Sequence, residues 1–375
     1  MAKLGEVCTV SPSTKNIERQ GAWLLNLDMV EQQTGRVIEY KYVGEDDLNG
    51  SIIQFDTENV LCSKLRPNLN KVVLPQKDGF STSELLPLRP DASVLNRDYL
   101  AVFLRSDSFV TWAVSKTAGA KMPRLGTKDL MNAEIPVPNI EQQKKIAEKF
   151  KKLEQLISLR KQQLEKLDEL IKARFVEMFG VVHNSVLYPY VPVKSFTSVV
   201  SGGTPNRNVS EFWNNGSIRW VKTTELQNNV ICNTDEKITQ AGLDNSSAKI
   251  IPPNTVLIAM YGQGKTRGMT GYTSIECATN QACACILPCE QFNQNYLWRY
   301  MILSYDKLRD MAKGGNQPNL NIGIIKNFPV LKPPIELQND FAAFAERVDQ
   351  QKQTVQQSLE KLELMKKALM QEYFG

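Results

Sequence analysis

Apolar residues recur every three or four positions along two long stretches of the chain, residues 141–180 and 336–375. The first stretch carries Ile146, Phe150, Leu153, Ile157, Leu164, Leu167 and Ile171. The second carries Phe341, Ala345, Val348, Val355, Leu359, Leu362 and Leu369. This heptad seam is typical of long helices that wind around a partner helix. Because the seam occurs twice in one chain, we expect the two helices to pair with each other.

The two stretches also match residue by residue. Pairs that lie 195 positions apart are Pro123 and Pro318, Ile140 and Ile335, Gln143 and Gln338, and Phe179 and Phe374. The segments before the helices match at offsets of 196 to 197, in the pairs Val60 and Val256, Glu84 and Gln281, and Tyr99 and Tyr296. A repeat of this length predicts two similar heads, each followed by a long helix.

We therefore expect four segments: a first head at 1–138, a long helix at 139–180, a second head at 181–334 and a second long helix at 335–375. The expected fold class is α+β, with two similar α/β heads joined by an antiparallel intramolecular coiled coil and related by pseudo-twofold symmetry. Asn139 is a candidate N-cap of the first helix and Gly180 a candidate C-cap. Forty helical residues at about 1.5 Å each would span roughly 60 Å.

Short strands and turns dominate the patterns of both heads. In the first head we expect strands at 37–43, 51–55 and 59–63, a helix at 97–109 and a polar loop at 116–128. In the second we expect strands at 217–223, 255–260 and 279–288, a loop at 261–271, a helix at 295–309 and a polar loop at 313–321. Proline-rich segments at 135–138 and 329–334 are expected to be extended hinges into the helices.

Composition narrows the class of protein. The 375 residues carry a net charge of +5, which permits nucleic-acid binding without demanding it. Seven cysteines without a disulfide-like framework favour a reducing compartment. A single histidine, His183, disfavours histidine-based catalysis. The chain has no signal peptide and no apolar run of about 18 residues, so we expect a cytoplasmic protein without a membrane span.

The segment VLIAMYGQGKT, residues 256–266, resembles a phosphate-binding loop but does not fit one. Ala259 stands where that motif needs glycine, and the sequence after Thr266 predicts a turn rather than a helix. A basic loop of this kind suits DNA better, because Lys and Arg hold phosphates or read guanine and Gln reads adenine. The candidate DNA-binding residues here are Tyr261, Gln263, Lys265, Thr266 and Arg267. An ordinary solvated hairpin is the alternative.

Further candidate DNA-binding residues lie at other loops of the two heads. In the first head they are Lys64, Arg66 and Lys71, in the position equivalent to the Tyr261 loop, and Lys121 and Arg124. In the second head they are Asn316, Gln317 and Asn319, equivalent to the Lys121 loop, together with Thr204, Lys222 and Thr223. Any one of these could be a solvated surface residue. Recurrence at matched positions of both heads makes a functional role about as well supported as a solvated surface.

Four cysteines of the second head, Cys277, Cys283, Cys285 and Cys289, lack the paired spacing of a zinc site. We expect them to be small buried apolar residues. The chain also shows no methyltransferase motif, no glycine-rich cofactor loop and no nuclease-like carboxylate cluster. It is therefore expected to be non-catalytic, with no metal and no cofactor.

Several segments together resemble the specificity subunits of type I restriction-modification systems. They are the two helix junctions IPVPNIEQQKKIAEKF and FPVLKPPIELQNDFAAF, the turn SGGTP, the strand and loop VLIAMYG, and the segments TNQACACILP and VLCSKLRPNLNKVVL. The resemblance covers nearly the whole chain. It implies that each head is a target recognition domain that reads one half of a split, asymmetric site in double-stranded DNA, with the helices setting the spacer.

The resemblance also implies partners. Two modification subunits would dock on the chain and methylate adenine, and restriction subunits would add ATP-dependent translocation and cleavage. None of that chemistry would lie in this chain. The alternative is a non-catalytic coiled-coil scaffold for protein interactions, and salt-dependent binding to duplex DNA discriminates the two.

Overall fold

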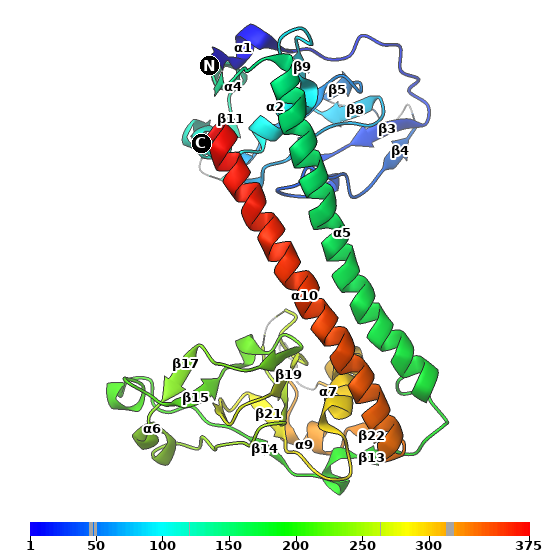
Figure 1. Cartoon of the computed structure of the whole chain (residues 1–375), viewed down its shortest axis with the longest axis vertical. Coiled ribbons are helices and arrows are strands. Elements are labelled where there is room, and N and C mark those ends of the chain that lie inside the picture. The colour runs from blue at the N-terminus through cyan, green and yellow to red at the C-terminus, as the bar shows by residue number, and fades with distance from the viewer. Residues whose placement is uncertain (45–47, 49–50, 120, 263, 313–318) are drawn as a thin grey trace. The chain divides into compact units, whose positions relative to one another are not determined.

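The computed structural model describes residues 1–44, 48, 51–119, 121–262, 264–312 and 319–375 (Figure 1). Contacts divide the chain into two compact units. Unit 1 consists of Met1–Gln162 and Gln356–Gly375, and unit 2 consists of Gln163–Val355. Each unit contains one head and a part of both long helices. The described part of the chain has no helix that is both long and apolar enough to cross a bilayer.

The two long helices are α5 (Ile140–Phe179) and α10 (Ile335–Phe374) (Figure 1). The side chain of Asn139 accepts a hydrogen bond of 2.9 Å from the backbone N–H of Gln142, as an N-cap does. Gly180 follows α5 in the left-handed conformation, with φ of +79°. Both caps expected for this helix are therefore present.

The helices pack antiparallel within each unit. In unit 1, Phe150 of α5 contacts Phe374 of α10, with ring centroids 6.4 Å apart, whereas Glu154 lies 2.8 Å from the Nζ of Lys366. Unit 2 shows the same reversal. There Phe175 contacts Phe341 at 5.4 Å, and the earlier Asp168 pairs with the later Lys352. Lys352 and Lys366, which interrupt the apolar seam, thus make ion pairs between the helices, as residues that fix the register do.

The first head has two four-stranded sheets. One has the order β2 (Cys8–Val10), β9 (Leu85–Pro90), β6 (Val60–Ser63) and β7 (Val72–Val73). The other has the order β4 (Lys41–Val43), β3 (Ala22–Leu25), β8 (Gly79–Thr82) and β5 (Ile52–Phe55). Two short pairs join β1 (Ala2–Lys3) to β12 (Glu134–Ile135), and β10 (Thr117–Ala118) to β11 (Arg124–Leu125). The α-helices are α1 (Leu4–Val7), α2 (Arg97–Leu104), α3 (Asp107–Ser115) and α4 (Thr127–Met131).

The second head has a five-stranded and a three-stranded sheet. The larger has the order β14 (Val199–Ser201), β21 (Cys283–Ile286), β18 (Val256–Ala259), β19 (Thr270–Thr273) and β16 (Asn229–Ile231). The smaller has the order β17 (Glu236–Ile238), β15 (Ile218–Val221) and β20 (Ala278–Thr279), and β13 (Tyr190–Pro192) pairs with β22 (Pro329–Leu331). The α-helices are α6 (Gln240–Asp244), α7 (Gln294–Leu303), α8 (Tyr305–Asp310) and α9 (Ile322–Lys326).

The two heads repeat one topology. The order β2-β9-β6-β7 recurs as β14-β21-β18-β19. In the second sheet, the parallel pair β3 and β8 recurs as β15 and β20. The expected repeat is therefore confirmed, with one correction of register. Val60 pairs with Leu88, and Val256 with Ile286, so Glu84 corresponds to Ala282 and not to Gln281.

Several expected elements are shorter than their patterns suggested. The helix expected at 97–109 is two helices, because the side chain of Ser106 accepts a hydrogen bond from the N–H of Phe109 and starts a second one. The helix expected at 295–309 likewise divides at Ser304. Residues 279–288 contain the end of β20 and all of β21 rather than one strand, the last two residues of the expected loop 261–271 belong to β19, and 116–128 include β10 and β11. The strand expected at 37–43 is reduced to 41–43.

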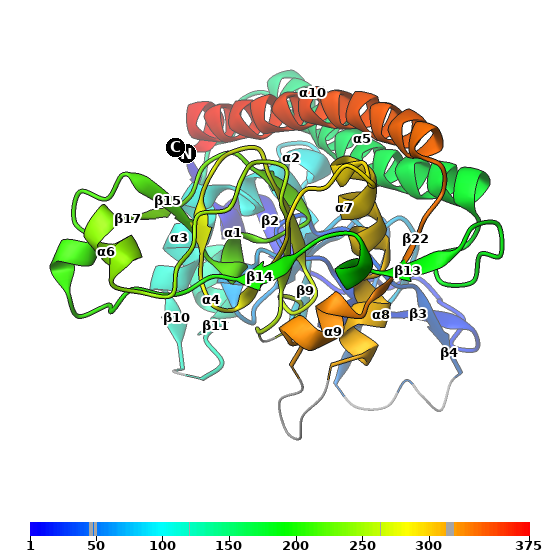
Figure 2. The same cartoon turned by 90° about the horizontal axis from the view of Figure 1, so that it is seen from below.

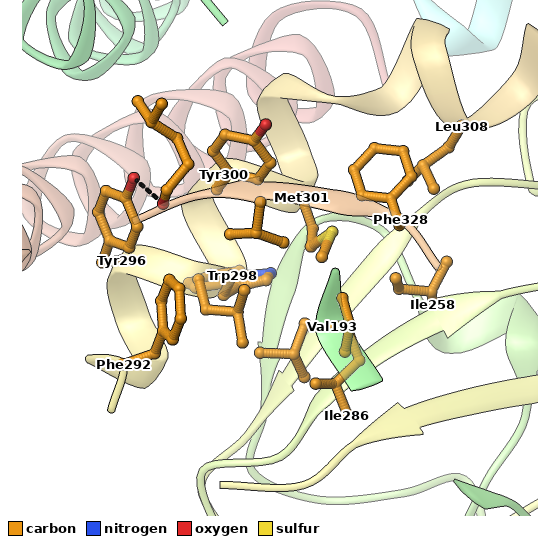
Figure 3. Packing of buried hydrophobic residues seen from close by; sticks show 14 of the residues in the cluster. Val193, Ile258, Ile286, Phe292, Tyr296, Trp298, Tyr300, Met301, Leu308 and Phe328 are labelled. Carbon is orange, nitrogen blue, oxygen red and sulfur yellow. Dashed lines mark hydrogen bonds between the residues drawn. The ribbon is translucent and has the colours of Figure 1, made fainter. Parts of the chain in front are cut away.

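The same contact joins each head to the end of a long helix. In the second head, Tyr296 of α7 packs against Phe179, with centroids 5.3 Å apart. The hydroxyl of Tyr296 donates to the carbonyl of Leu331 at 3.0 Å, the dashed line in Figure 3. In the first head, Tyr99 of α2 packs against Phe374 at 5.4 Å and donates to the carbonyl of Pro136 at 2.8 Å. In unit 2, α7 lies beside α10 in both views (Figure 2). The core of each unit thus includes a helix end.

A buried glutamine ties each hinge to its head. The Oε1 of Gln143 accepts from the N–H of Asn96 at 2.8 Å, and its Nε2 donates to the carbonyl of Pro138 at 2.7 Å. Gln338 makes the repeat-related bonds, to the N–H of Asn293 at 3.0 Å and to the carbonyl of Pro333 at 2.8 Å. Both side chains are fully buried. Their amide groups therefore satisfy backbone groups that water cannot reach.

Candidate nucleic-acid interface

The loop after β18 leaves the apolar core and becomes polar within two residues. Met260 is buried, whereas Tyr261 is 42% exposed and Lys265 is exposed. Three glycines give the loop positive φ angles, +143° at Gly262, +59° at Gly264 and +88° at Gly268, in the backbone region that glycine adopts most readily. We call residues 261–262 and 264–268 the second-head loop.

The first head has its counterpart after β6, at residues 64–71, which we call the first-head loop. Lys64 is half-buried and Arg66 is exposed with φ of +48°. The loop continues as a short 3-10 turn, Pro67–Leu69. Both loops therefore start at the same strand of the repeated sheet and carry cations.

In both heads a second candidate loop is bonded to the first by the same hydrogen bond. The N–H of Leu125 donates to the carbonyl of Lys64 at 2.9 Å, and the N–H of Leu320 donates to the carbonyl of Met260 at 3.0 Å. Leu320 lies 195 positions after Leu125, and Met260 lies 196 positions after Lys64. The structure thus brings Arg124 next to Lys64 and Arg66, and Asn319 next to Tyr261, whereas Lys121 lies further along the β10–β11 hairpin.

The backbone N–H groups of Lys64 and Met260 also make equivalent hydrogen bonds. The N–H of Lys64 donates to the carbonyl of Glu84 at 2.9 Å, and that of Met260 to the carbonyl of Ala282 at 2.8 Å. In the second head, the neighbouring Asn280 donates to the carbonyl of Val221 at 3.1 Å. Residues 280–282 therefore lie between the second-head loop and the strand end that carries Lys222 and Thr223.

The SGGTP turn meets the same segment. The hydroxyl of Thr204 donates to the side chain of Gln281. A Cβ on Gly202 would lie 1.9 Å from the carbonyl oxygen of Thr279, and one on Gly203 would lie 2.4 Å from the backbone nitrogen of Ala248. The two glycines are therefore required for close backbone packing, whereas Thr204 is partly exposed. Met260 at the start of the second-head loop, the end of β15 and the SGGTP turn thus all bond to residues 280–282.

Some predicted side chains already have partners within their head. Arg124 donates to Glu84 at 3.2 Å, and Lys222 lies 3.5 Å from both Asp235 and Glu236. The ammonium of Lys71 donates to the carbonyl of Leu27, and burial lowers its pKa. These cations hold the loops in shape within the free chain. Of the other predicted residues, Gln263, Asn316 and Gln317 lie outside the described part of the chain.

One cluster escaped the sequence analysis. The guanidinium of Arg207 lies 3.7 Å from the ring centroid of Trp213 and 4.9 Å from that of Trp220. Arg207 also pairs with Glu236 at 2.8 Å, and this hydrogen bond lowers the pKa of Glu236. An arginine stacked on tryptophans beside the Thr204 turn is of the type that contacts nucleic acid. The sequence feature that could have indicated this cluster is the pair of tryptophans close to a polar loop.

Three of the four cysteines expected to be buried are so. Cys277, Cys283 and Cys285 are buried in one apolar cluster with Leu257 and Ala259, and Cys289 is half-buried. Burial raises the pKa of Cys277 and Cys285 to about 12, so both thiols stay protonated. Within the described ranges, His, Cys, Asp and Glu residues form no group that could hold a metal ion. The interface is thus one of loops, cations and hydrogen-bonding side chains.

The sequence matches a known family model and is similar to several known proteins with related descriptions. Residues 2–169 and 188–364 match the family model described as "Type I restriction modification DNA specificity domain". Each matched segment contains one head and most of the helix that follows it. The chain is also similar to the type I restriction enzyme MjaIX specificity subunit of Methanocaldococcus jannaschii, at 22% identity over 369 residues, which covers 90% of this chain and 83% of that protein.

Two proteins of Escherichia coli are similar over shorter stretches. They are the EcoDI specificity subunit, at 26% identity over 33% of this chain, and the EcoR124I/EcoR124II specificity subunit, at 27% identity over 40% of it. The similar stretches span 27% and 37% of the length of these two proteins.

Two solved structures share the fold over all of the chain. One is the S subunit of a type I restriction-modification system from M. genitalium, with a TM-score of 0.63, 13% identity and 95% of that chain covered. The other, with a TM-score of 0.62 and 17% identity over 96% of that chain, comes from a study of complex assembly and conformational transition of the type I R-M system.

Proposed function

Because this chain belongs to the family of type I restriction-modification DNA specificity domains, we propose that each head reads one half of a bipartite site in double-stranded DNA. The observation that carries the proposal is the repeated junction of two polar loops. Lys64 and Met260 each join the same two loops through equivalent backbone hydrogen bonds. A repeated scaffold that presents loops of different sequence suits two related sites with different specificities.

The exposed cations would supply most of the affinity. We propose that Lys64, Arg66, Lys121 and Lys265 contact phosphates or guanine, because these side chains are at least partly exposed. Tyr261, Gln263, Thr266, Arg267, Asn316, Gln317 and Asn319 would add base or backbone contacts in the second head. The remaining candidates would make further DNA contacts beside these loops, and most of them also bond to other residues of their own head. They are Lys71, Arg124, Thr204, Lys222 and Thr223.

The long helices would set the spacer and bind the methyltransferase. In unit 1, α5 exposes Leu156 and Leu159 by 46% and 59%, and α10 exposes Leu364 and Met365 by 69% and 54%. Large apolar side chains on the surface of a helix pair are typical of a protein–protein interface. We propose that two modification subunits dock on the helices and heads, and that restriction subunits join this complex.

The partners would then carry the chemistry. In this proposal the modification subunits methylate one adenine in each half-site after flipping it from the duplex, and the restriction subunits use ATP to translocate and cleave. The chain itself needs no cofactor for recognition. We propose that the complex acts in the cytoplasm.

Selection from a random duplex pool tests the proposal, with the chain copurified with its methyltransferase partner. We expect two short fixed blocks separated by a constant gap that is not read. Exchange of the heads between this chain and a relative of different specificity would then assign each block. Retention of DNA without sequence preference would contradict recognition and favour a non-specific basic surface.

A substitution in the second-head loop gives a sharper test. Lys265→Ala should weaken binding, lower the slope of log affinity against log salt by about one, and relax the block read by the second head alone. Substitution of the exposed Lys194 by alanine removes the same charge from the same head, before β14 and at the opposite end of the sheet from the loop. An equal effect of the two substitutions would show that the lysine acts through net charge and not as a contact.

A further inference from the structure

We propose that Tyr305 and Arg309 of α8 are positioning residues that hold residues 264–268 of the second-head loop in the shape that reads DNA. This inference rests on the proposed function of that loop. The two side chains would contact no base themselves. They would act by fixing the backbone that carries Lys265, Thr266 and Arg267.

The hydrogen bonds run from α8 to the backbone of the loop. The hydroxyl of Tyr305 donates to the carbonyl of Lys265 at 2.8 Å. The Nη1 of Arg309 donates to the carbonyls of Gly264 at 2.9 Å and Arg267 at 3.0 Å. All three acceptors are backbone carbonyls. The bonds therefore restrain the path of the loop and do not use up the donors of its side chains.

The two clamping side chains also hold each other. The same Nη1 of Arg309 lies 3.1 Å from the hydroxyl of Tyr305, so its two N–H groups are shared among three acceptors, and the guanidinium lies 5.3 Å from the centre of the tyrosine ring. Leu308, which lies between them in α8, is fully buried in the core of unit 2 (Figure 3). The clamp is thus mounted on a rigid part of the head.

The loop turns at Gly268, which lies against the side chains of Tyr305 and Arg309. Gly268 has a φ of +88°, and a Cβ placed on it would lie 3.4 Å from both the Cγ of Arg309 and the ring of Tyr305. A loop with glycines at 264 and 268 has many accessible conformations when nothing holds it. Three hydrogen bonds from a packed helix would remove much of that freedom before DNA arrives, which lowers the entropic cost of binding.

The first head holds its loop with a similar device. Arg105, at the end of α2, donates to the carbonyl of Val72 through Nε at 3.2 Å and Nη2 at 2.7 Å. The side chain of Asn70 donates back to the carbonyl of Arg105 at 3.0 Å. In both heads, then, an arginine on the helical segment that follows the sheet holds carbonyl oxygens in or beside the candidate reading loop.

The test uses the full chain copurified with its methyltransferase partner and a random duplex pool. Tyr305→Phe removes one hydrogen bond without changing charge, and Arg309→Lys keeps the charge but cannot reach two carbonyls and a hydroxyl in the same way. Lys307→Ala is the control, since it removes a charge from α8, and Lys307 makes no hydrogen bond to the described part of the loop. The block read by the first head is an internal control in every selection.

We expect Tyr305→Phe and Arg309→Lys to reduce base discrimination in the second block by about tenfold, the effect of losing one good base contact. The first block, the salt dependence of binding and the Lys307→Ala selection should stay as in the unchanged chain. A second block that keeps its full discrimination in both clamp variants, while Lys265→Ala alters it, would overturn the positioning role alone. If Lys265→Ala also leaves the second block unchanged, the loop is not the reader and the assignment of the loop falls with the clamp.

Discussion

His183 is the only histidine of the chain and is placed to make unit 2 sensitive to acid. Its ring packs against Tyr300 and Phe328, and its Nε2 lies 3.1 Å from the hydroxyl of Ser304. Burial, together with the nearby charge of Lys307, lowers its pKa below the ordinary value of 6.5. The native state therefore favours the neutral ring, and the unfolded chain binds the extra proton more readily.

The sign of the pH dependence follows. The stabilisation by neutral His183 is fully present above pH 6.5 and is lost as the pH falls through the lowered pKa. We expect the melting temperature to drop between pH 7.5 and 5, and the drop to be smaller in His183→Asn. Asparagine is a suitable replacement because residue 183 has a φ of +66°, which asparagine tolerates. Equal pH slopes for the two proteins would contradict the assignment.

Single residues also show where sequence reasoning reached its limit. The residue types of the candidate interface were apparent from polar loops that follow apolar strands. Their partners were not, because Arg124 meets Glu84 from 40 positions away and Lys71 meets Leu27 from 44. Arg309 was missed for the same reason, since its acceptors lie more than 40 positions earlier. The partner of a side chain depends on the tertiary fold, and the neighbouring sequence does not indicate it.

At the scale of elements, the repeated glutamines explain how a long helix is joined to a head. Gln143→Leu would leave the N–H of Asn96 and the carbonyls of Val94 and Pro138 without their partner. We expect a loss of about 2–3 kcal/mol in the free energy of unfolding, because unsatisfied buried polar groups carry that cost. Chemical denaturation followed by circular dichroism measures it.

The chain contains its own controls for this prediction. Gln142→Leu changes an exposed neighbour and should be nearly neutral. Gln338→Leu makes the repeat-related change in unit 2 and should cost a similar amount. A loss in one unit without a loss in the other would mean that the two hinges are not energetically equivalent, despite their shared hydrogen bonds.

The elements differ in how well the sequence predicted them. The heptad seam and the 195-residue offset identify α5 and α10 almost to the residue, because forty positions contribute to one pattern. Short strands such as β19 and the break at Ser106 involve only a few residues. There the local pattern competes with a cap or with a pairing to a distant strand, and the tertiary contact decides.

At the scale of the whole molecule, the ruler hypothesis makes a prediction about length. Removal of seven residues from each helix, 158–164 in α5 and 356–362 in α10, keeps the heptad register and shortens each by about 10 Å. That distance corresponds to about three base pairs. We expect the gap that is not read to shorten by this amount, with both blocks unchanged, in selection from a random pool.

Removal of the heptad from one helix alone provides the control. It misaligns the antiparallel pair, so we expect loss of stability rather than a new gap length. A change in the sequence of either block in the doubly shortened chain would show that the helices shape the reading loops and do not act only as a spacer.

The division of the chain into units has a consequence for its synthesis. Unit 2 is one continuous segment, 163–355, whereas unit 1 needs 1–162 together with 356–375. Met370 and Phe374 lie in the same apolar core as Leu4 and Tyr99. A ribosome therefore makes the first head early but cannot supply the residues that close its core until residues 356–375 have been made. The head that is made second is completed first, and the earlier one stays open to chaperones and proteases in the meantime.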